Sequence, residues 1–395
     1  MINKIAIVWE SEEGGGVNSY LKYLLSSKSF REKEITIITN VNNSGHKSLE
    51  KDFKKFKNIR FEFFSSFFVR KRNIIIKILL YFFKPLFLLI TIFNLKRVLN
   101  KDYDLLLCQC GNYGTFRSEQ AAIFAAKLLK IPLRFLVIHH ACEKPQKFLE
   151  IFHYLTNIFL RNSASGLITV SNATLKTVKK NSNILRKNCL KTKIIHNGVP
   201  KFKENRILKK YRNIRVIMMS RLVQNKGHEI LLESLKKLPY KNLKKFNFDI
   251  IGEGSERYKA KLQKLIKKSK LCNYVKIQGF KTGNSQNIIS KYDLFISLTK
   301  DYEGFGLSIA EAMSSNVPVI ATNVGAVSEF CNNENSTLIK PNSAKDLTKS
   351  LNDFLKKKIE FKKKSKKAQD EIHMYFNNEL MGKKYFQFFN NIKYN

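Results

Sequence analysis

Two glutamates, Glu303 and Glu311, are separated by seven residues that begin with a Gly-Phe-Gly loop. The apolar run 294–298 before them predicts a buried strand, and the pattern at 307–313 predicts a helix. A glycine loop in this position presents free backbone N–H groups and the positive end of a helix to an anionic ligand such as a phosphate. Because carboxylates repel phosphates, we expect the glutamates to accept hydrogen bonds from hydroxyls, as on a ribose and a sugar. An ordinary loop before a surface helix is the alternative.

The positive charge that a phosphate needs is found in another loop. Arg221 and Lys226 lie at 220–227, between a predicted strand at 215–219 and a predicted helix at 228–238. Two cations and a helix dipole would converge there, where a diphosphate could bind. Only 14 of the 72 basic residues are arginine, so Arg221 is the more informative of the two.

A run of glycines follows the first predicted strand. Gly14, Gly15 and Gly16 lie between the apolar run 5–9 and a predicted helix at 17–25. This order allows the backbone to approach a phosphate or a sugar closely. The spacing G-x-G-x-x-G is absent, so we do not predict a dinucleotide cofactor site.

Two histidines follow a predicted strand, and two aspartates precede one. His139 and His140 follow a predicted strand at 133–138, and ligands of open α/β sheets gather at such carboxyl ends. We expect one of the two to face a ligand, and a structural histidine is the alternative. Asp102 and Asp104 have the D-x-D spacing of metal ligands but precede a strand, so we interpret them as a solvated cap.

The elements that would position these residues alternate along the chain. Short apolar runs are separated by helix-length segments such as 117–129 and 148–161, which is typical of βαβ units. The turn-rich stretch 196–200 and the charged stretch 201–212 predict a domain boundary. The alternation then restarts, and Gly252 follows one of the new strands. We therefore predict the α/β class with two Rossmann-like domains, at 1–200 and 201–374, and a terminal helix at 375–395.

Composition limits the partners. The net charge of +41, from 72 Lys and Arg against 31 Asp and Glu, suggests nucleic acid, an anionic membrane or a phosphorylated substrate. Nucleic acid is the least favoured, because lysines are spread over the whole length and arginines are few. The six cysteines are scattered, so we predict no disulfide framework and expect Cys108 and Cys110 to lie in the core. The stretch 5–9 is too short for a signal peptide, which favours a cytoplasmic location.

The segment 61–99 is the most hydrophobic part of the chain. Lys77, Lys84 and Pro85 interrupt it, whereas a membrane-spanning helix needs about 18 uninterrupted apolar residues. Arg70, Lys71 and Arg72 precede the stretch 74–95, and Lys96, Arg97 and Lys101 follow it, as in a surface that lies in a lipid headgroup layer. Interfacial docking on a membrane and a buried pair of helices therefore stay open as alternatives.

Together these features resemble the retaining glycosyltransferases of the two-domain GT-B fold, in particular glycosyltransferase family 4, also called glycosyl transferases group 1. The resemblance covers nearly the whole chain. It rests on an ordered set of segments: 14–17, 139–140, 166–171, 196–199, 220–222, 226–227, 252–254 and 303–311.

The resemblance implies a nucleotide-sugar donor, a UDP-, GDP- or ADP-sugar, held mainly by the second domain. Arg221 and Lys226 would bind the diphosphate, and Glu311 would bind the ribose. Glu303, Gly252 and the backbone that follows Glu303 would contact the transferred sugar and the diphosphate. The residues of that backbone are Gly304, Phe305, Gly306 and Leu307.

The resemblance also implies roles for the first domain. Gly15 and Gly16 would approach the same phosphates, and His139 or His140 would lie near the reacting sugar. The acceptor would bind mainly to this domain, and the terminal helix would cross back to it. The family retains the anomeric configuration and does not require a metal. We expect a saccharide or lipid-linked saccharide acceptor, in bacterial surface polysaccharide or glycolipid synthesis at the inner membrane face.

Two other classes of function stay open. A non-enzymatic basic protein would bind membrane or nucleic acid through its lysines, and Glu303 and Glu311 would be dispensable. A nucleotide-sugar epimerase or a phosphorylase would keep the fold and change the reaction, because one fold hosts many activities. A glycogen-type phosphorylase would need a lysine-bound pyridoxal cofactor, and no lysine in the sequence points to one.

Overall fold

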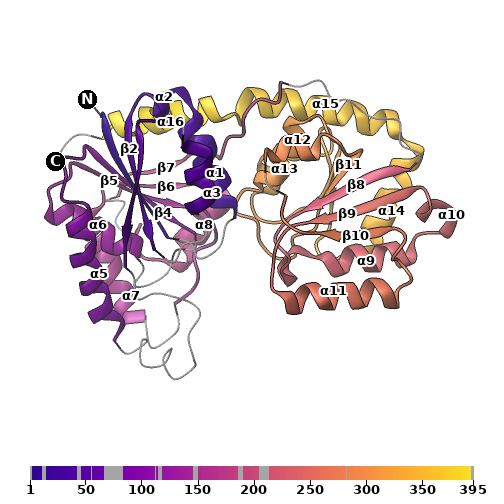
Figure 1. The fold of residues 1–395 in the computed structure, drawn as a ribbon, viewed down its shortest axis with the longest axis horizontal. Helices are drawn as coiled ribbons and strands as arrows, with labels where there is room; N and C mark the ends of the chain where they lie inside the picture. The colour runs from indigo at the N-terminus through magenta and orange to yellow at the C-terminus, as the bar shows by residue number, and fades with distance from the viewer. Residues whose placement is uncertain are drawn as a thin grey trace. The chain divides into compact units, whose positions relative to one another are not determined.

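The computed structural model describes residues 2–10, 15–41, 46–54, 56–65, 83–111, 113, 118–145, 150–185, 190–203, 213–281 and 283–392. The chain forms two compact units, each built on a parallel sheet with helices around it (Figure 1). Unit 1 comprises Met1–Gly198 and Asn378–Asn395, and unit 2 comprises Val199–Asn377. The predicted α/β class is confirmed.

The sheet of unit 1 has seven parallel strands in the described residues, in the order β3-β2-β1-β4-β5-β6-β7. All six residues of β4 are buried, as expected for a parallel strand covered by helices on both faces. The order reverses between β1 and β4, so the topological switch point lies there. The strands are β1 (Lys4–Trp9), β2 (Glu34–Asn40), β3 (Ile59–Phe64), β4 (Leu105–Cys110), β5 (Leu133–Ile138), β6 (Gly166–Thr169) and β7 (Thr192–Ile194).

The helices of unit 1 form two groups on opposite faces of this sheet (Figure 1). α1 packs against α2, α3 and α16 on one face, and α6 packs against α5 and α7 on the other. The reversal of strand order explains this, because right-handed crossovers then place successive helices on different faces. The helices are α1 (Gly16–Ser26), α2 (Lys28–Arg31), α3 (His46–Phe53), α5 (Lys84–Val98), α6 (Ser118–Leu128), α7 (Glu150–Ser163), α8 (Asn172–Asn181) and α16 (Asn378–Asn390).

The sheet of unit 2 has six parallel strands in the described residues, in the order β10-β9-β8-β11-β12-β13, with its switch point between β8 and β11. β10 and β13 are only four and three residues long, and their short apolar patterns did not identify them as strands. The strands are β8 (Ile214–Met219), β9 (Phe246–Ile251), β10 (Val275–Gln278), β11 (Leu294–Ser297), β12 (Val319–Thr322) and β13 (Thr337–Ile339). The helices are α9 (His228–Lys237), α10 (Tyr240–Leu243), α11 (Glu256–Lys268), α12 (Ser285–Ile289), α13 (Leu307–Ser314), α14 (Ala344–Lys356) and α15 (Lys358–Tyr375).

The end of the chain returns to unit 1. The terminal helix expected from residue 375 begins only at Asn378, because the helix geometry is interrupted after Tyr375 and α15 ends there in unit 2. α16 packs against α1 and α2, and the buried hydroxyl groups of Tyr385 and Tyr20 form a hydrogen bond of 2.6 Å. A buried polar pair of this kind fixes one position of α16 on α1.

The hydrophobic segment 61–99 is described in part. Its beginning completes β3, its end forms α5, and residues 66–82 lie outside the described part of the chain. Leu88, Leu95 and Leu99 of this segment are buried in the core of unit 1. Among the described helices, none has the length and apolar character that crossing a membrane would require.

Candidate functional site in unit 2

Four loops interlock at the carboxyl edge of the unit 2 sheet. Lys300 N donates to Asn225 O (2.8 Å), and Ala326 N donates to Glu303 O (2.9 Å). Two of the loops follow β8 and β11, which flank the switch point, where open α/β sheets bind ligands. The loops occupy residues 220–227, 252–255, 298–306 and 323–326.

Gly252 is required by the packing of two of these loops. Its φ is +156°, and a Cβ added there would lie 1.9 Å from the carbonyl oxygen of Ser220. Any side chain would therefore separate the loop after β9 from the loop after β8. The structure gives Gly252 a role in loop packing, in addition to any contact with a ligand.

Lys226 and Glu303 form an ion pair across two of these loops. Lys226 Nζ lies 2.6 Å from Glu303 Oε2, and the side chains are 20% and 18% exposed. Thr299 Oγ1 accepts from Lys226 Nζ (3.3 Å) and donates to Glu303 Oε2 (3.0 Å). The sequence predicted separate roles for the lysine and the glutamate, and this direct contact was not anticipated. Because Lys226 keeps further N–H donors, it can still bind an incoming phosphate.

Two further groups that could bind an anion belong to the loops of this edge. The Arg221 side chain is exposed and forms no hydrogen bond or ion pair with the described part of the chain. Gly306, with φ +100°, caps the N-terminus of α13, whose first amides have no partners within the helix. The half-buried residues Leu307 and Ser308 carry these amides. A guanidinium and a helix N-terminus together can bind a diphosphate.

Two predicted ligand contacts are buried. The Phe305 ring is 2% exposed and stacks on Phe330 with 4.8 Å between ring centroids, so its backbone rather than its ring is available to a ligand. Gly304 beside it is also buried. Glu311 is 3% exposed and lies one helical turn after Leu307, on the same face of α13.

Thr299 and His228 are residues of this edge that the sequence analysis missed. His228 begins α9 and is fully buried, and its Nε2 lies 3.2 Å from Ser220 Oγ. Burial lowers the pKa of His228 to about 4, so its ring is neutral at pH 7. Thr299 could have been identified as a polar residue directly after a predicted buried strand. His228 could have been identified because it follows a glycine and begins a predicted helix.

The predicted glycines of unit 1 stand at the start of α1. Gly15 is the N-terminal cap and Gly16 is the first helical residue. A Cβ at either position would meet no atom of the described residues within 4 Å. Gly14 lies outside the described residues.

The two histidines at the end of β5 differ in accessibility. His139 is buried, with Nε2 at 2.8 Å from Gln109 Oε1 and its ring edge-on to Tyr20, 4.4 Å between centroids. Burial lowers the pKa of His139 to about 3, so it is neutral at pH 7. His140 is half-buried. His139 is therefore part of the buried interior of unit 1, and His140 has the more accessible ring of the two.

The remaining polar candidates have structural roles. Asp104 Oδ2 accepts from Asn3 N (2.7 Å) and Lys4 N (2.9 Å), which confirms its interpretation as a cap. Cys108 and Cys110 are buried in the core, as expected. Among the described residues, no group of three or more His, Cys, Asp or Glu side chains is placed to hold a metal ion.

The predicted residues thus divide between the units. Gly15, Gly16, His139 and His140 belong to unit 1. The others gather at the carboxyl edge of unit 2: Arg221, Lys226, Gly252, Glu303, Gly304, Phe305, Gly306, Leu307 and Glu311.

A solved structure shares this fold. The structure of Anabaena Alr3699/HepE in complex with UDP and glucose matches with a TM-score of 0.75 at 19% identity, over 98% of this chain and 100% of that chain. The two Rossmann-like units are therefore those of the GT-B fold, as predicted.

The sequence of unit 2 is similar to a known family. Residues 201–371 match the model described as glycosyl transferases group 1. The UDP-N-acetylglucosamine–peptide N-acetylglucosaminyltransferase GtfA subunit of Streptococcus parasanguinis is 32% identical over 158 residues, 40% of this chain and 30% of that protein. The poly(ribitol-phosphate) alpha-N-acetylglucosaminyltransferase of Staphylococcus aureus (strain COL) is 30% identical over 198 residues, which are 50% of this chain and 38% of that protein. The matches thus span about a third of these curated relatives. Through residues 201–371, the chain is similar in sequence to the group 1 glycosyltransferases.

Proposed function

We propose that this protein transfers a sugar from a nucleoside diphosphate sugar to a saccharide or lipid-linked saccharide, in bacterial surface polysaccharide or glycolipid synthesis. The Lys226–Glu303 pair, at the same sheet edge as the exposed Arg221 and the N-terminus of α13, carries this proposal. A UDP-sugar is the favoured donor, because relatives are named for UDP-N-acetylglucosamine or have been solved with UDP.

In this proposal the cations and helix amides of unit 2 stabilise the leaving diphosphate as the glycosidic bond breaks. Glu303 positions Lys226 and accepts a hydrogen bond from the transferred sugar, and Glu311 binds the ribose. We do not propose a metal, because Arg221, Lys226 and the helix dipole supply the positive charge. Retention would follow from attack on the face that the leaving phosphate vacates, with the phosphate taking the acceptor proton.

The unit 1 residues would have roles of their own. Gly15 and Gly16 would let the N-terminus of α1 approach the phosphates. His140 would contact the sugar or the acceptor. His139, which is buried, would support His140 from the interior of unit 1. The acceptor would bind to this unit, and the protein would act in the cytoplasm, peripherally on the inner face of the plasma membrane.

Thermal unfolding with added nucleotides tests the donor. UDP or a UDP-sugar at 100 times its Kd should stabilise the native state by about 2.7 kcal/mol and raise the apparent Tm. The same experiment with GDP- and ADP-sugars identifies the base. The variant Arg221→Ala should shift less at equal ligand concentration, because it loses a phosphate contact. Absence of a shift with every nucleoside diphosphate would contradict the proposed function.

A further inference from the structure

The C-terminal end of α13 is held by one stripe of polar residues on α15. Ser365, Gln369 and His373 are four residues apart, so they lie on the same face of α15, which packs against α13 (Figure 1). Gln369 Nε2 donates to Ser314 O (3.0 Å), and His373 Nε2 lies 2.9 Å from Ser314 Oγ. Ser365 Oγ donates to Asn316 Oδ1 (2.8 Å), two residues beyond the helix. Of the three residues in the stripe, His373 is the one that can change its charge between pH 5 and pH 8.

The hydroxyl group of Ser314 is the centre of this contact. Ser314 is fully buried, and Gln286 Nε2 of α12 donates to its Oγ (2.9 Å) and to Pro200 O (2.8 Å). Phe202 N donates to His373 Nε2 (3.2 Å) and to Ser314 Oγ (3.3 Å). Pro200 and Phe202 belong to the segment in which the chain enters unit 2. This segment and the helices α12, α13 and α15 therefore meet at one buried hydroxyl group.

The hydrogen bond from Phe202 requires a neutral His373 ring. A backbone N–H group can only donate, so the Nε2 atom that faces it must carry a lone pair and no proton. A proton on Nε2 would break this bond. It would also prevent the Ser314 hydroxyl group from donating to the ring.

The surroundings of His373 favour the neutral ring. Burial has the largest influence on the pKa of His373 and lowers it, and the charge of Lys201 lowers it further. The Ser314 carbonyl and Asp370 raise this pKa to a smaller extent, and Lys366 lowers it slightly. α12 and α13 present uncharged groups to the contact, the amide of Gln286 and the hydroxyl of Ser314. The contact is therefore present at pH 7 and is lost as the pH falls through the lowered pKa of His373.

α13 carries two parts of the candidate donor site. Its N-terminus follows Gly306, and Glu311 lies three residues before Ser314. Ser315 Oγ donates to Glu311 O (2.8 Å), which joins Glu311 to the same end of the helix. A helix of eight residues is only about 12 Å long and moves as one body. A displacement at Ser314 would therefore also displace Glu311 and the helix N-terminus.

We propose that neutral His373 is a positioning residue for the nucleotide-sugar donor: through Ser314 it holds α13 where Glu311 and the helix N-terminus can bind the nucleotide. His373 would act through α13, without touching the donor. Protonation of the ring would loosen the end of α13, so that affinity for the donor would fall in acid. This inference rests on the proposed function in one respect, because it takes the donor to bind at α13.

Calorimetric titration with UDP-glucose from pH 7.5 to pH 5 tests the inference. UDP-glucose is preferred to UDP, whose terminal phosphate gains a proton at about pH 6. The affinity of the wild type should fall about fivefold in acid, which is the usual effect of losing one hydrogen bond. His373→Gln should bind as the wild type does at pH 7.5, because its amide oxygen can accept from Phe202 N, and it should lose the acid weakening. His373→Lys is charged throughout this range and should bind weakly at every pH.

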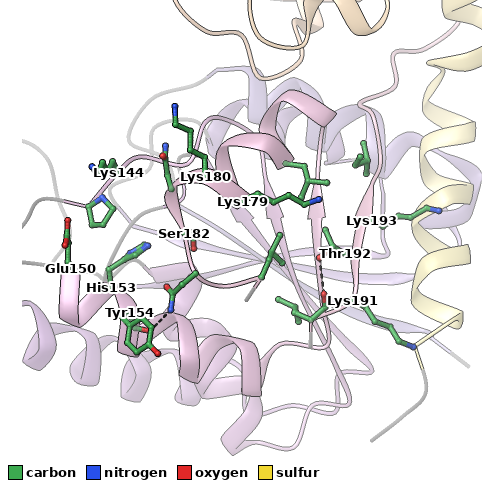
Figure 2. Close-up of a pocket in the computed structure, with 17 residues that line it drawn as sticks. Lys144, Glu150, His153, Tyr154, Lys179, Lys180, Ser182, Lys191, Thr192 and Lys193 are labelled. Carbon is green, nitrogen blue, oxygen red and sulfur yellow. Dashed lines mark hydrogen bonds between the residues drawn. The ribbon is translucent and has the colours of Figure 1, made fainter. Parts of the chain in front are cut away.

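A basic cavity in unit 1 is a second place where acid could change the binding of an anion. It has a volume of about 980 Å³, lies between α7, α8 and β7, and is lined by His153 and several lysines (Figure 2). Lys179→Ala/Lys180→Ala removes two exposed charges from this basic cavity and is the matched control. Its affinity for UDP-glucose and its pH dependence should equal those of the wild type. Loss of the acid weakening in this variant would overturn the inference.

Hydrogen–deuterium exchange without nucleotide tests the positioning itself. Relative to the intrinsic rate at each pH, the amides at 309–316 should exchange faster at pH 5 than at pH 7.5 in the wild type. They should show no such change in His373→Gln. The same pH dependence in the wild type and His373→Gln, or wild-type affinity in His373→Lys, would overturn the inference. Absence of UDP-glucose binding at pH 7.5 would count against the proposed function, and the exchange rates would still decide the role of His373.

Discussion

Replacing Lys226 with alanine is expected to lower the rate of sugar transfer by about a hundredfold or more, which is the usual effect of removing one group that stabilises developing charge. Its ammonium lies 2.6 Å from Glu303, at the edge where we place the leaving diphosphate. Without it, Glu303 would stand unneutralised beside two phosphates and repel them. Release of the nucleoside diphosphate from the donor, with and without acceptor, measures the effect.

Lys237→Ala is the matched control for this variant. Lys237 pairs with Glu233 at 2.7 Å in the same unit, but on an exposed helix surface with the side chains 51% and 55% exposed. Such a pair contributes little to stability, so transfer should be unchanged. Far-ultraviolet circular dichroism checks that both variants are folded. Wild-type transfer by a folded Lys226→Ala protein would refute the role assigned to Lys226.

Replacing Gly325 with alanine is expected to destabilise the native state by about 2–4 kcal/mol. Gly325 has φ +57°, and a Cβ there would lie 2.2 Å from the carbonyl oxygen of Glu303. Two backbones would have to separate, which would displace Glu303 and Lys226, so UDP binding should weaken as well. Denaturant unfolding followed by circular dichroism measures the stability, and calorimetric titration measures the binding.

The variant Gly283→Ala is the control that separates the effect of a positive φ from the effect of a steric clash of the added Cβ. Gly283 also has a positive φ, +112°, but a Cβ there would meet no atom of the described part of the chain within 4 Å. This variant should lose only the stability that the strained backbone conformation costs and should bind UDP normally. If Gly325→Ala and Gly283→Ala behaved alike, close packing against Glu303 would not be the cause.

Much of the fold could be predicted from the sequence, because parallel strands buried on both faces are continuous apolar runs. The runs 5–9 of β1 and 105–108 of β4 are of this kind. β10 and β13 were missed because strands of three or four residues carry little pattern. The sequence also gives no clear sign that α15 ends at Tyr375 and α16 begins at Asn378. The terminal helix was therefore expected to begin at residue 375.

The sequence identified individual residues of the candidate site, but it did not predict which of them contact one another. Arg221, Lys226 and Glu303 were identified from loops that follow buried strands. The Lys226–Glu303 pair spans 77 positions and exists because β8 and β11 are neighbours in the sheet. Strand order is a property of the whole fold, which local patterns do not specify. The contact of His139 with Gln109 depends on tertiary packing for the same reason.

Hydrogen–deuterium exchange with and without UDP tests most directly whether the carboxyl edge of unit 2 binds the donor. Bound UDP should slow exchange of the amides at 220–227 and 304–308, because the phosphates would accept their hydrogen bonds or bury them. The amides at 151–159 on α7 should exchange at the same rate in both states. Protection confined to the basic cavity of unit 1, or no protection at 304–308 under saturating UDP, would contradict the assignment of this edge as the donor site.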